Sequence, residues 1–232
     1  MNPFSNRRPP DHHRSRAAFT LVELLVVIAI IGILAALIIG GAGIASIKAR
    51  TYRVQAERDA LITAIEQYKA HQGYYPPDNT NNPAINALYY ELTGTLTTNN
   101  NALFKAVTGE QLASGTVQTV FGMQGFMNAS ADPTEPPKNF FGAIGKGART
   151  ASFYVSGNAG PTFTLFGISV PPGLPAGFPY VLASGGVPSL WHYVSSNPTN
   201  NPSEFDLWMD VAWAGKTNRI SNWSKDPQVV TH

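Results

Sequence analysis

The hydrophobic pattern of the chain is dominated by one long apolar run near its start. Residues 24–45 carry no charged side chain, and a single carboxylate, Glu23, lies within the apolar stretch 18–47. An α-helix needs about 20 apolar residues to cross the hydrocarbon core of a bilayer. The pattern therefore predicts a membrane-spanning helix over 19–47, with one acidic residue close to its start.

The same helix is expected to continue in amphipathic form. Residues 48–72 contain no proline or glycine, and Gly73 followed by Tyr-Tyr-Pro-Pro marks a stop. The apolar positions that recur at helical spacing are Val54, Leu61, Ile65 and Tyr68. We expect these four to face a folded head, with Glu57 and most other charged residues elsewhere on the helix.

Beyond the helix, shorter patterns predict a small mixed domain over 73–232. We expect a short helix over 84–96. The expected strands cover 152–155, 162–170, 179–183, 190–195 and 204–213, followed by a turn over 214–218 and a return strand over 219–223. Sequential strands with short connections indicate antiparallel pairing. Residues 97–150 carry no pattern that assigns them. The fold class is thus α+β, a long N-terminal helix packed on a C-terminal antiparallel sheet.

The charged residues before the apolar stretch predict the orientation of the helix in the membrane. Residues 1–18 contain four arginines against Asp11 alone, for a formal charge of +3, and Pro9 and Pro10 argue against a folded element there. A basic leader before an apolar helix stays on the cytoplasmic side, so the C-terminal part is expected to be exported. The remainder has 12 basic and 13 acidic residues. This balance gives no reason to expect nucleic-acid binding.

The junction between leader and helix is the most specific motif. Residues 18–25 read Ala-Phe-Thr-Leu-Val-Glu-Leu-Leu. They resemble the prepilin cleavage and methylation motif of type IV pilins and type II secretion pseudopilins. The resemblance implies that a prepilin peptidase removes residues 1–18, cuts between Ala18 and Phe19, and methylates the new amino group of Phe19. The family usually has glycine before the cut, and this chain has Ala18.

Glu23 would be the fifth residue of the processed chain. The resemblance implies that its carboxylate pairs with the amine of Phe19 on a neighbouring subunit, where a buried charge without a partner would be costly. A second interpretation is local: Thr20 and Glu23 have the spacing of a capping box at a helix start. Both roles can hold, capping in the membrane monomer and pairing in the filament.

The resemblance also implies a pilin-like organisation and a structural role. It divides the chain into the cleaved cytoplasmic leader 1–18, a transmembrane assembly half 19–47, an amphipathic half 48–72 and a periplasmic head 73–232. The chain would be a single-pass inner-membrane protein that joins other pilin-like subunits, in a homo- or hetero-oligomeric filament, on a secretion or pilus assembly platform. We favour a type II secretion-like pseudopilin that supports protein export.

Two alternatives remain open, a type IV pilus subunit and a membrane-tethered periplasmic protein that binds a glycan or exported cargo. The late tryptophans fit either a small core or subunit interface, or a carbohydrate- or partner-binding surface: Trp191, Trp208, Trp213 and Trp223. Many type IV pilins close a C-terminal loop with a disulfide, and this chain has no cysteine. That difference favours a type II secretion-like pseudopilin or an uncharacterised relative of this family.

The remaining chemistry predicts no cofactor, metal or catalytic site. Major pseudopilins bind calcium in an acidic loop, and the corresponding residues 209–218 are nearly devoid of acid. Asp206 and Asp210 share one strand face, but Ca²⁺ takes six to eight oxygens, so we interpret them as exposed strand charges. His71 and His192 have no acid or nucleophile at a suggestive spacing. The chain is therefore not expected to be an enzyme.

Overall fold

The computed structural model describes residues 20–98, 100, 102–142, 150–184, 186–213 and 215–230. The chain divides into two compact units, Met1–Lys48 and Ala49–His232. The predicted leader 1–18 and both residues of the predicted cleavage site, Ala18 and Phe19, lie outside the described residues.

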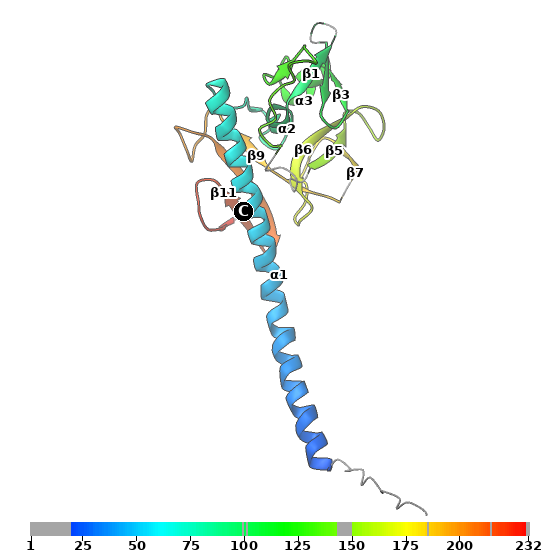
Figure 1. Ribbon diagram of the computed structural model, residues 1–232, viewed down its shortest axis with the longest axis vertical. Helices are drawn as coiled ribbons and strands as arrows, with labels where there is room; N and C mark the ends of the chain where they lie inside the picture. The colour runs from blue at the N-terminus through cyan, green and yellow to red at the C-terminus, as the bar shows by residue number, and fades with distance from the viewer. Residues whose placement is uncertain are drawn as a thin grey trace, which may run out of the picture. The chain divides into compact units, whose positions relative to one another are not determined.

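One helix, α1, covers Leu21–Gln72 and belongs to both units (Figure 1). The predicted helical conformation of 48–72, and of 19–47 from Leu21 onward, is confirmed. Its predicted end is confirmed as well, since Gly73 has φ +88° and its N–H donates to the carbonyl of Lys69 at 2.8 Å. Glycine adopts this left-handed conformation at little cost, which makes it a common helix terminator.

In the first unit, the side chains of residues 21–37 are exposed on every face of α1. Among the described residues, no helix combines the length and the apolar character that crossing a membrane requires. The predicted span 19–47 includes Phe19 and the side chains of 38–44, which lie outside the description.

The second unit adds two short helices and twelve strands within the described residues. The helices are α2 (Leu88–Thr93) and α3 (Ser114–Phe121). The strands are β1 (Thr95–Thr98), β2 (Leu103–Ala106), β3 (Gln111–Ala113), β4 (Ala129–Ser130), β5 (Thr150–Tyr154), β6 (Thr162–Ile168), β7 (Val181–Ser184), β8 (Ser189–Leu190), β9 (His192–Val194), β10 (Asp206–Trp213), β11 (Lys216–Ser221) and β12 (Gln228–Val230).

These strands form three four-stranded sheets in the described part of the chain, where one antiparallel sheet was expected. Their orders are β3-β2-β1-β4, β7-β5-β6-β8 and β12-β11-β10-β9. The pairing is antiparallel as predicted, except that β1 and β4 are parallel. The chain is thus a mixed helix-and-sheet protein.

The predicted strand 190–195 is wrong as a single element. It divides at Trp191, whose side chain is buried and whose N–H bonds to the carbonyl of Phe166. The residues before it, β8, pair with β6, and those after it, β9, pair with β10. Trp191 therefore marks the point where the chain passes from one sheet to the next.

Other predicted strands are confirmed with small shifts, as β5, β6, β7 and β10. The predicted turn 214–218 is wrong for its second half, because β11 already begins at Lys216. The predicted helix 84–96 shortens to the six residues of α2. Asn86 explains the later start, since its side chain accepts the N–H of Leu88 and donates to the carbonyl of Trp191. Asparagine side chains often replace helical backbone bonds in this way. The earlier end falls at Gly94, whose φ is +82° and which directly precedes β1.

The inner stripe of α1 is confirmed, since Val54, Leu61, Ile65 and Tyr68 are fully buried. The expectation for Glu57 is wrong. Its side chain is only 8% exposed, and Oε1 accepts a hydrogen bond from Nε1 of Trp191 at 3.0 Å. A buried carboxylate needs such a partner, so a charged residue completes the contact between α1 and the sheets.

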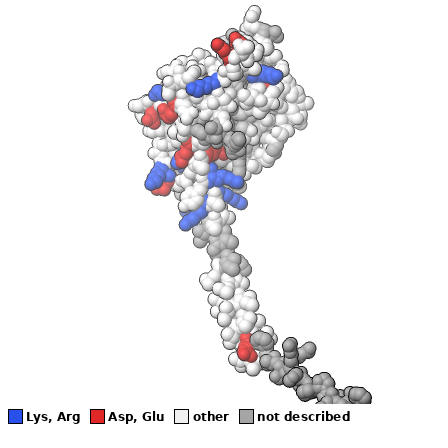
Figure 2. All heavy atoms as spheres, viewed as in Figure 1, with Lys and Arg blue, Asp and Glu red and all other residues white. Residues whose placement is uncertain are grey.

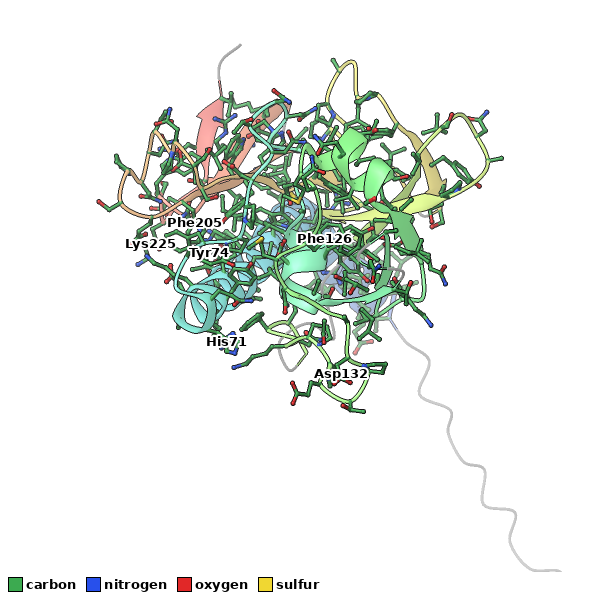
Figure 3. All side chains as sticks on the ribbon, turned by 90° about the horizontal axis from the view of Figure 1, so that it is seen from above. His71, Tyr74, Phe126, Asp132, Phe205 and Lys225 are labelled. Atoms are coloured by element: carbon green, nitrogen blue, oxygen red, sulfur yellow. The ribbon has the colours of Figure 1, made fainter. Side chains whose placement is uncertain are left out.

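Aromatic side chains pack in several clusters in the head, among them one around Phe126 and one around Phe205, both labelled in Figure 3. Phe126 stacks on Tyr90 with ring centroids 4.5 Å apart. Phe205 contacts Tyr75 and Tyr193, with centroids at 5.1 and 5.8 Å. Both clusters join residues that are far apart in the sequence, so they hold the sheets to the segment that follows α1.

A buried carboxylate, Glu91 on α2, links α1 to the loop before β4. The hydroxyl of Tyr68 donates to its Oε2 at 2.9 Å, and the backbone N–H groups of Met127 and Asn128 donate to the two oxygens at 2.8 and 2.9 Å. Burial raises the pKa of Glu91 despite these donors. The bonds make this carboxylate a fixed junction of three segments.

Candidate functional site

The start of α1 is built around Thr20 and Glu23. The backbone N–H and the hydroxyl of Thr20 both donate to Oε2 of Glu23 at 2.8 Å. In return, the N–H of Glu23 donates to the Thr20 hydroxyl at 3.2 Å. These reciprocal bonds form a capping box, which satisfies N–H groups that a helix start otherwise leaves unpaired. The predicted capping interaction is therefore present.

Glu23 lies in a segment whose other side chains are almost entirely apolar. Leu21, Val22 and Leu24 are 79%, 69% and 60% exposed. In Figure 2 the lower part of α1 shows uncharged surface with one acidic group near its start. A helix that is apolar on all faces normally lies inside a protein assembly or a membrane. The carboxylate thus belongs to a surface that requires a covering partner.

The pairing predicted for Glu23 needs the amine of Phe19 on a second subunit. Phe19 and Ala18 lie outside the described residues. Cleavage, methylation and pairing therefore remain predictions.

Asp206 was expected to be an exposed strand charge, and this is wrong. Its side chain is 2% exposed, and its carboxylate accepts the backbone N–H groups of Thr199, Asn200 and Asn201 at 2.8–2.9 Å. Burial alone would raise the pKa of Asp206, but these donors outweigh it and lower the pKa. The carboxylate organises the asparagine-rich loop before β10.

A second carboxylate, Asp78, holds the other end of this loop and was not singled out by the sequence. It accepts the N–H groups of Ser195 and Ser196 at 2.9 and 3.1 Å, and the hydroxyl of Ser196 at 2.9 Å. Its place in a Pro-Pro-Asp turn directly after a helix was the available signal.

Asp210 is partnered within the sheet. Nε and Nη2 of Arg219 donate to its two oxygens, each at 2.8 Å, across the β10–β11 pair. In the part of the chain that the structure describes, no group of three or more His, Cys, Asp or Glu residues is arranged to hold a metal ion.

The histidines and tryptophans contact other rings. His71 lies 5.6 Å from the ring of Phe140, and His192 stacks on Trp208 with centroids 4.9 Å apart. Trp208 also approaches Trp223 at 5.9 Å. Trp191 is part of the core, as the first of the two interpretations expected, whereas Trp208, Trp213 and Trp223 are half-buried.

Comparison with known proteins identifies a family motif near the start of the chain. Residues 13–39 match the family model of the prokaryotic N-terminal methylation motif. They therefore carry the prepilin-type signature of pilin-like proteins, which are structural rather than enzymatic. The matched segment contains the predicted cleavage site and Glu23. Neither a curated protein nor a solved structure matches the chain.

Proposed function

We propose that this chain is a structural subunit of a pilus-like filament. A prepilin peptidase removes the leader 1–18, and residues 19–47 anchor the processed chain in the inner membrane with the head in the periplasm. The observation that carries the proposal is the methylation-motif match over 13–39, since this segment couples a processing site to a helix start.

The exposed apolar surface of α1 supports an assembly role. Side chains of residues 21–37 have no cover within the described chain. Burying one leucine- or isoleucine-sized side chain contributes about 1.5–3 kcal/mol, so covering many of them drives association strongly. Lipid covers this surface before assembly, and α1 helices of neighbouring subunits cover it in the filament.

Glu23 supplies the directional part of the association. Cleavage leaves a cationic amine on Phe19, which needs an anionic partner once water is excluded. Both donors of Thr20 bond to Oε2 of Glu23, and neither bonds to Oε1. The proposal assigns Oε1 to the amine of an adjacent subunit. One such pair per subunit fixes the register between neighbouring helices, the best-attested use of buried polar pairs.

A type II secretion-like pseudopilin is the form of filament subunit that we favour over a type IV pilus subunit. The absence of cysteine supports it, because a disulfide-closed C-terminal loop is impossible here. The filament then serves as a short scaffold or piston during protein export.

The test changes Glu23 to alanine in the full chain, with Glu135→Ala as the matched control. Glu135 is an exposed carboxylate in a loop of the head. We expect both variants to be processed and inserted, since cleavage precedes assembly, and only the Glu23 variant to be missing from sheared filament fractions. Filament content is measured by immunoblotting, and processing by N-terminal sequencing of the membrane fraction.

Two results would overturn the proposal. Filament incorporation of the Glu23 variant equal to that of the Glu135 control would remove the assembly role. A mature chain that begins at Met1 or after Ala45, instead of at Phe19, would remove the prepilin assignment.

A further inference from the structure

The second unit contains a cavity that the filament role does not use. It has a volume of about 370 Å³ and lies between a proline-rich loop and strands of two sheets. The loop contributes Pro172, Gly173, Leu174, Pro175 and Ala176, and the strands contribute Ser189, Leu190, His192, Asp210 and Thr217. Ligand sites in proteins have this character, a mainly apolar wall with a few converging polar groups.

Hydrogen bonds hold the proline-rich loop in place over the strands. The carbonyl of Pro171 accepts the N–H of Ala212 on β10 at 2.6 Å. The hydroxyl of Ser189 donates to the carbonyl of Val170 at 2.9 Å and accepts the N–H of Gly173 at 3.3 Å. Three strand-to-loop bonds make the cavity a preformed one, so a ligand does not have to order its wall.

Gly173 is required for this path of the loop. Its φ is +90°, and a Cβ atom there would lie 2.8 Å from Cγ1 of Val187. Both the backbone conformation and the close approach exclude larger residues.

The polar floor comes from three adjacent strands. His192 pairs with Trp208, Asp210 with Arg219, and Thr217 with Ala212, so the three polar residues share the sheet face opposite Leu207, Met209 and Val211. Those three apolar side chains are fully buried. The sheet therefore uses one face for the core and presents His192, Asp210 and Thr217 on the other.

The floor carries hydrogen-bonding capacity but little net charge. Arg219 neutralises Asp210 through two bonds of 2.8 Å, which leave further lone pairs on each carboxylate oxygen. Burial lowers the pKa of His192, which keeps its imidazole neutral. Nδ1 of His192 is buried and has no hydrogen-bond partner among the described residues. Because this atom is buried, it does not face a ligand in the cavity, and the floor offers its hydrogen bonds through Asp210 and Thr217.

These properties define the ligand chemically. A neutral floor disfavours ions, and acceptors on Asp210 with a hydroxyl on Thr217 favour a molecule bearing several hydroxyl groups. The opposite wall of Pro172, Leu174 and Pro175 suits an apolar C–H surface. A single sugar ring combines both faces and fits a cavity near the lower end of the usual ligand-site volumes.

We propose that this cavity binds one neutral sugar ring. The ring hydroxyls bond to Asp210 and Thr217 on the floor, beside the ring of His192, and the C–H face packs on the proline-rich loop. The site does not depend on the filament role of Glu23, and it gives the head a recognition function in either a filament subunit or a tethered binding protein.

The experiment uses the full chain in dodecylphosphocholine micelles, a detergent without sugar groups. Saturation-transfer difference NMR is recorded with the methyl glycosides of glucose, galactose, mannose and N-acetylglucosamine as probes. We expect millimolar binding of at least one of them, since a single ring makes few contacts.

Three variants locate the binding. Ala176 is an exposed residue at the cavity, so Ala176→Trp fills the opening and weakens binding by about tenfold or more. Thr217→Val removes one hydroxyl and weakens it about two- to tenfold, the range expected for one lost hydrogen bond. Ala131→Trp, at an exposed loop position outside the cavity, is the matched control and leaves binding unchanged.

Circular dichroism of each variant verifies that the fold is retained before binding is compared. The proposal is overturned if none of the glycosides shows saturation transfer at its solubility limit. It is equally overturned if Ala176→Trp and Ala131→Trp bind alike, or if proline-containing peptides bind in the cavity and the glycosides do not.

Discussion

Nε1 of Trp191 donates a hydrogen bond to Oε1 of Glu57 at 3.0 Å, across 134 positions of sequence. Both side chains are buried, the tryptophan at the junction of β8 and β9 and the glutamate on α1. On the same helix, Nη1 of Arg58 donates to the carbonyls of Ser221 and Ser224 at 3.0 and 3.2 Å. These two adjacent polar residues attach α1 to the junction of β8 and β9 and to the end of β11 and the residues after it.

Replacing Trp191 with phenylalanine tests this contact. The variant removes the indole N–H that donates to Glu57 and shrinks a fully buried side chain, and we expect a loss of about 1–3 kcal/mol in the free energy of unfolding. The measurement is urea denaturation of the full chain in micelles, followed by tryptophan fluorescence and circular dichroism. Glu57→Gln, which keeps an acceptor oxygen, is the control with a smaller loss. Equal stability of Trp191→Phe and the parent chain would contradict the assigned role.

The Asp206 carboxylate is expected to make the asparagine-rich loop sensitive to acid. Its pKa is lowered in the folded chain, so it stabilises the fold above its unfolded pKa, and this contribution is lost as the pH falls through the folded pKa. Asp206→Asn removes about 2–3 kcal/mol at neutral pH, because an amide cannot accept from all three N–H groups. Thermal unfolding between neutral and acidic pH measures both effects. A parallel pH dependence of variant and parent would contradict the prediction.

Calcium is expected to leave the stability of the described head unchanged. Backbone N–H groups already satisfy Asp206, and Arg219 satisfies Asp210, so neither carboxylate requires a cation. A ligand that binds only the folded state raises the unfolding temperature. Scanning calorimetry with excess calcium and with EDTA therefore shows the same midpoint, and an increase with calcium would contradict it.

Glu91 is expected to have the opposite pH dependence from Asp206. Its pKa is raised by burial above the ordinary 4.5, so the folded chain holds its proton more tightly than the unfolded chain. The stability contributed by protonated Glu91 is therefore lost as the pH rises from the unfolded to the folded pKa. The difference in unfolding free energy between the parent and Glu91→Gln shrinks over that interval. A difference that grows with pH would contradict the burial effect.

Removing the Thr20 hydroxyl tests the capping box separately from assembly. Thr20→Val loses the hydroxyl bonds to Glu23, which costs about 1 kcal/mol of local helix stability. Amide hydrogen exchange of residues 21–24 is expected to accelerate in this variant and to return to parent rates in Thr20→Ser. Unchanged exchange in Thr20→Val would show that the box does not stabilise the start of α1.

The buried side of α1 could be predicted from the sequence because the apolar residues on one face of a helix recur every three or four positions. Val54, Leu61, Ile65 and Tyr68 are all buried as expected. Glu57 was misplaced because its partner, Trp191, comes from a distant part of the sequence. Single-sequence periodicity classes a carboxylate as exposed, and only tertiary contacts reverse that assignment.

In the head, too, contacts between residues of different segments could not be predicted from local patterns. Alternation identified β10, which is buried on one face, but it gave no sign that the loop residues 199–201 fold back to cover Asp206. Residues 97–150 were unassignable because their elements are short: β2 and β3 have four and three residues, and α3 has eight. The Thr20–Glu23 contact was predictable because its two members lie three positions apart.

Arg58 and Ser224, which are joined by a hydrogen bond, lie 166 positions apart in the sequence. This separation determines when their contact can form during synthesis of the chain. A ribosome adds about 5–20 residues per second, so Arg58 is made roughly 8–33 s before Ser224. During that interval Arg58 lacks these carbonyl partners, and the contacts that join α1 to the end of β11 and the residues after it form only once that segment has been made. A premature stop before β11 would therefore leave the processing motif intact but produce a subunit whose helix never acquires its folded head.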